Sequence, residues 1–152
     1  KLMTYAGMIS IIANGIVLAT GKFYPFFAPF IGAFGAFITG SATNCNVLFG
    51  PLQSAVAGNL SSDMNFTYWL VASNAGSGGI GKMVSPQSIA IAIAAITPAI
   101  AAYAKQKQIS KEIEDNLYNS ITPSSIMSSS YLYMFLFLTI YAVITYFGSL
   151  LL

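Results

Sequence analysis

Two clusters of small polar residues stand out in an otherwise apolar sequence. The first cluster holds Thr39, Ser41, Thr43, Asn44 and Asn46, and the second holds Asn74, Ser77, Lys82, Ser85 and Gln87. Hydroxyl and amide groups can donate hydrogen bonds to an anion, and Lys82 adds a positive charge. No pair of a nucleophile and a base is visible. The two clusters therefore suit the binding of an anionic ligand, and we do not expect an enzyme.

The composition is that of a membrane protein. Of 152 residues, 56% are hydrophobic and only 7% are charged, whereas about a quarter are charged in a soluble domain. The chain has no Arg or His, and its one cysteine, Cys45, cannot form an internal disulfide or a zinc cluster. We therefore expect no metal and no cofactor. The net charge of +2 comes from scattered lysines, so the sequence does not predict binding to nucleic acid.

The elements that hold the two clusters are predicted to be membrane helices. Residues 3–20 and 131–152 are uncharged and long enough to cross a bilayer. The sequence begins inside an apolar stretch, and we interpret the chain as a fragment of a larger, multi-pass protein. The fold class we expect is an all-α integral membrane protein in a single membrane domain.

The first polar cluster lies within residues 25–58. A short apolar block, Phe26 to Thr39, precedes the cluster, and a second block, Val47 to Ala57, follows it. Two short apolar helices joined by a polar tip are typical of a re-entrant hairpin, whose irregular backbone faces protein or water. The alternative is an ordinary surface loop between two short spans, because short apolar segments are ambiguous.

The second polar cluster lies within residues 66–103, which we interpret as one discontinuous transmembrane helix. Four glycines between Gly76 and Gly81 disfavour a continuous helix, so we expect the chain to unwind from Asn74 to Pro86. Ser85 and Pro86 form a favourable helix start, with a capping hydroxyl followed by proline. Two broken helices in a charge-poor region are a sequence indication of a transporter binding site.

The segment 105–120 differs from the rest of the chain. It contains three Lys and three acids, with Ile109, Ile113 and Leu117 at every fourth position. This pattern predicts an amphipathic helix that lies at the membrane interface, or that packs its apolar stripe on the rest of the protein.

Each candidate residue also has a structural interpretation. Lys82 could extend its charge to the interface or stabilise helix C-termini, but an ionisable residue inside a membrane segment favours a site. Some of the Ser and Thr hydroxyls could cap helices or join neighbouring helices. Cys45 is most simply a packing residue, and the aromatic residues from Phe23 to Phe30 are most simply lipid-facing or core residues.

Three motifs resemble the carboxy-terminal part of the L-lactate permease family. They are YPFFAPF from Tyr24, TGSATNCNVLFGPLQ from Thr39 to Gln53, and GKMVSPQSIAIA from Gly81 to Ala92. The resemblance implies a plasma-membrane transporter that carries lactate, and often glycolate, together with protons. It also implies the architecture of the wider ion transporter superfamily, in which a hairpin tip meets the unwound loop of a broken helix. An inverted repeat, here expected in a missing N-terminal half, supplies the matching half of the site.

The resemblance leaves the coupling ion open. Ser41-Ala42-Thr43 has Ala42 where the superfamily signature has a polar residue. No Asp or Glu lies in a predicted membrane segment, so a proton carrier is expected outside this chain. The alternatives are a sodium-coupled carrier of mono- or dicarboxylates, and, in another class, a channel or a structural membrane subunit.

Overall fold

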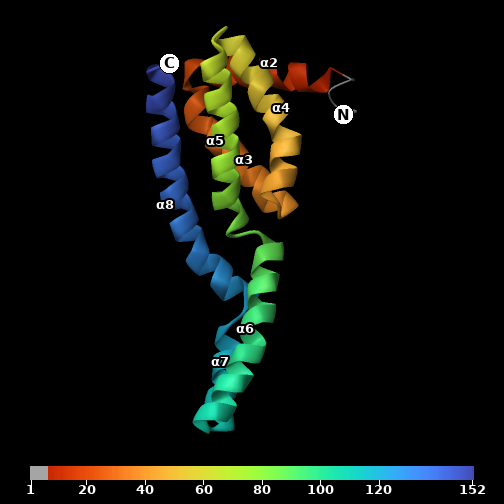
Figure 1. Ribbon diagram of the computed structural model, residues 1–152, viewed down its shortest axis with the longest axis vertical. Coiled ribbons are helices and arrows are strands. Elements are labelled where there is room, and N and C mark those ends of the chain that lie inside the picture. The colour runs from red at the N-terminus through yellow and green to blue at the C-terminus, as the bar shows by residue number, and fades with distance from the viewer. Residues whose placement is uncertain (1–6) are drawn as a thin grey trace.

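The computed structural model describes residues 7–152, and all regular elements in this range are helices. Helices α3, α4, α5 and α8 run side by side, α2 crosses one end of them, and α6 extends beyond the other end with α7 beside it (Figure 1). The elements in chain order are α2 (Met8–Thr20), η1 (Gly21–Phe23), α3 (Tyr24–Thr39), α4 (Ala42–Leu60), α5 (Met64–Lys82), α6 (Pro86–Lys107), α7 (Lys111–Ser120) and α8 (Pro123–Leu150).

Three stretches of the described chain are long and apolar enough to cross a membrane. They are Met8–Thr39, which contains α2, η1 and α3, and the helices α6 and α8. Much of the apolar surface of α6 and α8 is exposed, including Ile91, Phe135 and Ile144. An exposed apolar surface of this extent is stable in lipid, not in water. The chain is therefore an α-helical integral membrane protein.

Helix α3 lies at the centre of the bundle because one of its faces is made of small residues. A Cβ atom built on Gly32 would overlap the Ser77 hydroxyl of α5, and one built on Gly81 of α5 would overlap the backbone of Ala33. Small residues at these positions let two helix backbones approach each other closely, which is a common way to join helices in a membrane. The buried residues of α3 are Tyr24, Pro25, Ala28, Pro29, Gly32, Ala33, Gly35 and Ala36.

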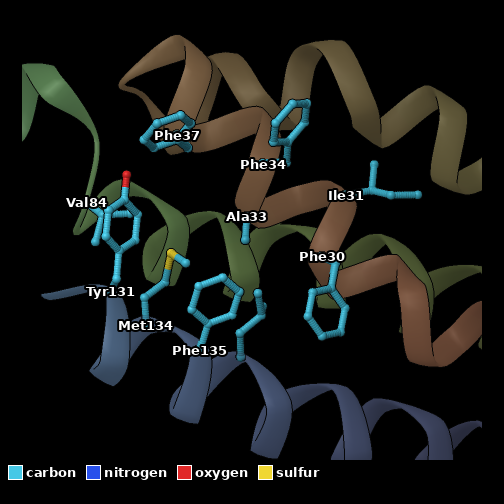
Figure 2. A pocket seen from close by; sticks show the side chains of 10 residues that line it. Phe30, Ile31, Ala33, Phe34, Phe37, Val84, Tyr131, Met134 and Phe135 are labelled. Carbon is cyan, nitrogen blue, oxygen red and sulfur yellow. The ribbon is translucent and has the colours of Figure 1, made fainter. Parts of the chain in front are cut away.

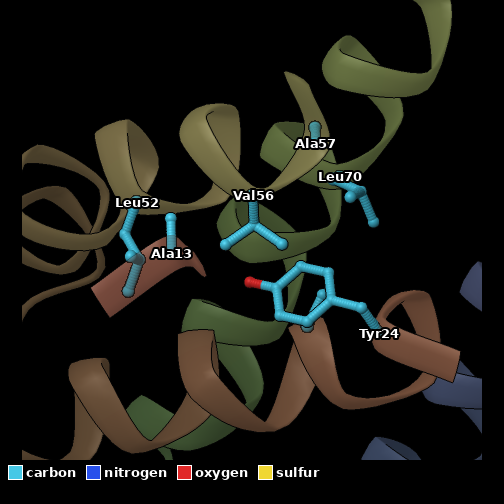
Figure 3. Packing of buried hydrophobic residues seen from close by; sticks show 7 residues of the cluster. Ala13, Tyr24, Leu52, Val56, Ala57 and Leu70 are labelled. Atoms are coloured by element: carbon cyan, nitrogen blue, oxygen red, sulfur yellow. The ribbon is translucent and has the colours of Figure 1, made fainter. Parts of the chain in front are cut away.

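An apolar core joins α2 to α3, α4 and α5. The buried members of this core are Ala13, Tyr24, Ala28, Leu52, Val56, Ala57 and Leu70. Figure 3 shows the Tyr24 ring inside this cluster, with Val56 beside its hydroxyl end. This core fixes the end of the bundle that lies away from the two polar clusters.

The break between α3 and α4 is shorter than predicted. Only Gly40 and Ser41 separate the two helices, whereas we expected an irregular tip from Thr39 to Asn46. Gly40 has φ 65°, a left-handed conformation that ends α3. The Ser41 hydroxyl then accepts a hydrogen bond from the Asn44 N–H at 3.2 Å, so a cap starts α4 at once. Thr43, Asn44 and Asn46 are therefore helical.

The break between α5 and α6 is also shorter than predicted, and it lies later in the chain. The prediction that the chain unwinds from Asn74 onward is wrong, because α5 continues to Lys82 and only residues 83–85 are non-helical. Three of the four glycines, Gly76, Gly78 and Gly81, pack against neighbouring helices instead. A Cβ on Gly76 would overlap Tyr141 of α8, and one on Gly81 would overlap Ala33. The predicted helix start is confirmed, since the Ser85 hydroxyl accepts from the Ser88 N–H at 3.3 Å.

The other predicted boundaries change by a few residues. Helix α2 begins at Met8, and residues 3–6 of the predicted span 3–20 lie outside the described residues. The predicted amphipathic helix 105–120 is reduced to α7, because α6 continues to Lys107 before Gln108 adopts φ 52°. Helix α7 packs along α6, where the Tyr118 hydroxyl donates to the Thr97 carbonyl at 3.3 Å. Helix α8 begins at Pro123 instead of 131, because Thr122 and Ser125 form a capping box.

Candidate functional site

The two helix breaks pack against each other. A Cβ atom built on Gly40, at the α3–α4 tip, would overlap the Gln87 side chain in the first turn of α6. The adjacent Ala42, which begins α4, lies against Gly78 of α5. Figure 1 shows the α3–α4 tip beside the end of α5. Gly40 thus has two reasons to be glycine: its positive φ and the side chain of Gln87 in front of it.

Four of the ten predicted site residues are exposed around this junction. They are Thr43, Asn44, Lys82 and Gln87. Lys82 is the last residue of α5, about 28 Å along the helix from Asp63 at a rise of 1.5 Å per residue. Asp63 caps the other end of α5, accepting from the Asn65 N–H at 2.9 Å. The Lys82 ammonium group and the Asp63 carboxylate therefore lie at opposite ends of α5.

Three of the predicted hydroxyl residues serve the backbone locally. Ser41 and Ser85 cap α4 and α6, as described above. Thr39 donates to the Gly35 carbonyl at 2.8 Å and to the Ser41 carbonyl at 3.0 Å. These three residues shape the junction by holding the helix ends, which agrees with the structural interpretation of the hydroxyls.

The remaining three predicted residues belong to the bundle interior. Asn74 and Ser77 are buried on α5, and Asn46 is half-buried on α4. Asn74 donates through its side-chain nitrogen to the Asn46 side-chain oxygen at 2.8 Å, and the Ser77 hydroxyl donates to the Asn74 carbonyl at 3.1 Å. The structure therefore joins one residue of the first cluster to the second cluster by a direct hydrogen bond.

This hydrogen bond is one end of a longer buried network that we did not predict. Gln53 of α4 is completely buried, and its nitrogen donates to the Asn74 side-chain oxygen at 3.4 Å and to the Ala28 carbonyl at 3.1 Å. The Tyr24 hydroxyl donates to the Gln53 side-chain oxygen at 2.6 Å. The signal was present in the sequence, because Gln53 lies on the same helical face as Asn46, seven residues earlier.

Cys45 has the packing role expected for it. It is completely buried, and its thiol lies 3.0 Å from the Gly32 carbonyl of α3. Its sulfur also lies 3.9 Å from the Asn74 side-chain nitrogen. Among the described residues, no buried side-chain nitrogen or oxygen lacks a hydrogen-bond partner. The buried polar side chains of this region are therefore all paired within the fold.

An apolar cavity of the described chain lies away from the two polar clusters. It has a volume of about 530 Å³ and lies between α3 and α8, next to the α5–α6 break. Figure 2 shows the rings of Phe30, Phe34 and Phe37 from α3 on one side, with Met134 and Phe135 from α8 on the other. None of the ten predicted site residues lines this apolar groove. It does not have the chemistry of an anion site.

Comparisons with known proteins agree with the three motifs. An L-lactate permease of Streptococcus iniae is 57% identical over 72 residues, which are 47% of this chain and 15% of that protein. The glycolate permease of Escherichia coli K12 is 50% identical over 92 residues, or 60% of this chain and 16% of that protein. An L-lactate permease of Halalkalibacterium halodurans is 43% identical over 96 residues, which are 63% of this chain and 18% of that protein.

The chain thus spans less than a fifth of the length of the curated relatives it matches. No solved structure gives a significant match. The sequence profile of the L-lactate permease family matches residues 1–135, which is most of the chain. The chain belongs to the L-lactate permease family.

Proposed function

We propose that this chain forms part of a secondary active transporter that carries L-lactate, or a similar small 2-hydroxy monocarboxylate such as glycolate, together with protons. Two relatives, one a lactate permease and the other a glycolate permease, support this substrate class. The observation that carries the proposal is the junction of the two helix breaks, with Gly40 against Gln87. A transporter site commonly lies where two interrupted helices meet.

The junction can attract a carboxylate through two helix N-termini. Helices α4 and α6 both begin there. The caps Ser41 and Ser85 occupy the N–H groups of Asn44 and Ser88, which leaves the N–H groups of Ala42, Thr43 and Gln87 without a partner within their helices. These groups carry a partial positive charge, which favours an anion. We assign the exposed donors Thr43, Asn44 and Gln87 to the carboxylate site, with Asn46 at its inner wall. Thr39, Ser41, Asn74, Ser77 and Ser85 then hold this arrangement.

Lys82 has two roles consistent with its position. It lies in the last turn of α5, where a positive charge stabilises the helix C-terminus. It is also exposed at the same junction as Thr43 and Gln87, and can attract the substrate. Removal of the Lys82 charge separates the two roles. If Lys82 stabilises the helix end, the stability of the protein falls, and if Lys82 attracts the substrate, the half-saturation concentration for lactate rises.

The substrate and the coupling ion are tested by uptake into vesicles that contain the full-length protein. Labelled lactate should accumulate when a proton gradient is imposed and should exchange with unlabelled lactate or glycolate. Uptake that follows a sodium gradient instead would favour the sodium-coupled alternative. Flux that neither saturates nor runs uphill would favour a channel and would contradict the proposal.

The role of Lys82 is tested by the variant Lys82→Met. We expect the half-saturation concentration for lactate to rise about tenfold, which corresponds to about 1.4 kcal/mol of binding free energy. Lys22→Met is the matched control, because Lys22 is also exposed but lies before α3, away from the junction. Equal kinetics for the two variants would remove Lys82 from the site.

A further inference from the structure

Each amide of the buried network can be hydrogen-bonded in only one orientation, and the Ala28 backbone carbonyl sets the first of them. The Ala28 carbonyl can only accept a hydrogen bond, so the side-chain nitrogen of Gln53 must face it, as it does at 3.1 Å. The Gln53 oxygen is then left to face Tyr24, whose hydroxyl donates to it at 2.6 Å. The orientation of the Gln53 amide is therefore set by its surroundings.

The orientation of Gln53 sets that of Asn74. The Gln53 nitrogen also donates to the Asn74 side-chain oxygen at 3.4 Å, so Asn74 turns its own nitrogen toward α4. There it donates to the Asn46 oxygen at 2.8 Å. Gln53 and Asn74 are completely buried, so water is not present to compensate a reversed amide. If either amide were turned over, donor would face donor and acceptor would face acceptor, and these unpaired groups would cost free energy in the protein interior.

The network therefore determines what Asn46 presents at its accessible end. Its oxygen is occupied by Asn74, and within the part of the chain that the structure describes no hydrogen bond uses its side-chain nitrogen. Asn46 is half-buried and lies one turn after Ala42, the first residue of α4. Two N–H donors are thus available near the junction of the breaks.

We propose that Gln53 and Asn74 are positioning residues, which hold Asn46 with its N–H donors toward the substrate so that the site accepts a carboxylate. This inference rests on the function proposed above and assigns the inner wall of that site. An amide that is free to turn could present either its oxygen or its nitrogen. A fixed amide presents only donors, which favours anions over cations and contributes specificity without a charge.

The proposal is tested with the variant Asn46→Asp in the full-length protein. The substitution keeps the side-chain shape, and one carboxylate oxygen still accepts from the Asn74 nitrogen, so the buried network stays complete. The other oxygen replaces the N–H donors and repels the substrate. We expect the half-saturation concentration for lactate to rise at least tenfold, at equal amounts of protein in the vesicles.

The matched control is Asn59→Asp. Asn59 is exposed at the far end of the same helix, where its nitrogen donates to the Asn14 oxygen at 2.8 Å. This variant adds the same charge to α4 and should leave the half-saturation concentration within twofold of the parent. Asn46→Ala is the second variant at the site itself. It removes the donors without adding a charge and should give a smaller rise than Asn46→Asp.

A third variant acts on the network alone. Gln53→Met keeps a similar volume but removes the N–H donor to Asn74, so the Asn74 amide and then the Asn46 amide are no longer held in one orientation. We expect a higher half-saturation concentration with a maximal rate that changes less, although residue 53 does not touch the substrate. Asn46→Asp and Asn46→Ala with parental half-saturation concentrations would overturn the inference. A parent that takes up neither lactate nor glycolate would instead overturn the proposed function.

Discussion

Helix α3 packs against α5 and against α8 in different ways. Toward α5 it presents small residues, so that Gly32 and Gly81 leave no room for even one added methyl group. Toward α8 it presents the rings of Phe30, Phe34 and Phe37, and an apolar groove of about 530 Å³ remains between the two helices. One interface is closed by backbone contact, and the other is left partly open.

The difference indicates which part of the bundle positions the candidate site. All ten predicted site residues lie on α3, α4, α5, the start of α6 or the two breaks between these helices. The buried amide network also joins α3, α4 and α5. Helix α8 contributes none of them. The C-terminal part of α8 is joined to α5 by a hydrogen bond, in which the Trp69 indole donates to the Thr145 carbonyl at 2.9 Å. The tightly packed unit of α3, α4 and α5 therefore fixes the site geometry.

The largest effect should come from adding one methyl group to the closed interface. Gly81→Ala places a Cβ onto the backbone of Ala33, which a side-chain rotation cannot relieve. We expect a loss of about 3 kcal/mol in the free energy of unfolding, the upper range for overpacking. Thermal unfolding of the purified protein in detergent measures this loss.

Gly79→Ala is the control for that substitution. Gly79 is in the same helix, and a Cβ there has open space around it. Because Ala is the better helix former, the control should be neutral or gain up to about 1 kcal/mol. Similar losses in both variants would mean that helix propensity, and not contact with α3, explains the result.

A much smaller effect should follow from removing a whole ring at the open interface. Phe135 lines the groove and is 55% exposed, so Phe135→Ala enlarges a space that is already there. The exposed part of the Phe135 ring faces lipid, which is as apolar as the protein interior, so its contact with the protein adds little to the free energy of unfolding. We expect a loss of about 0.5 kcal/mol or less in the same unfolding measurement. A loss above about 2 kcal/mol would show that α8 is held as tightly as α5.

The sequence alone predicted the helical class, because low charge and long apolar segments leave few other structures. It also predicted that the chain is interrupted twice, although the second break begins at Met83 and not at Asn74. It also predicted the start of α6, since Ser85 and Pro86 have a local capping role that does not depend on tertiary contacts. Such features depend on residues that are close together in the sequence, so they can be predicted without the tertiary structure.

The extent of each break was not predictable in the same way. Glycine has low helix propensity, but in the folded chain Gly76 allows contact with α8 and Gly81 allows contact with α3, and that packing outweighs the propensity. Ser41 could have been identified as a cap, which would have placed Thr43 and Asn44 in a helix. The role of Tyr24 depends on Gln53, which is 29 residues away in the sequence, so local patterns could not reveal it.

The central claim is that one substrate carboxylate is bound where the two breaks meet. The most direct measurement is substrate protection of cysteines placed on each side, Thr43→Cys on α4 and Gln87→Cys on α6, in full-length protein without other accessible cysteines. Both positions are exposed, whereas the native Cys45 is buried. The account predicts that lactate slows maleimide labelling at both positions at the same half-effective concentration, and that chloride does not. Protection at only one position, or at neither, in protein that transports lactate would contradict it.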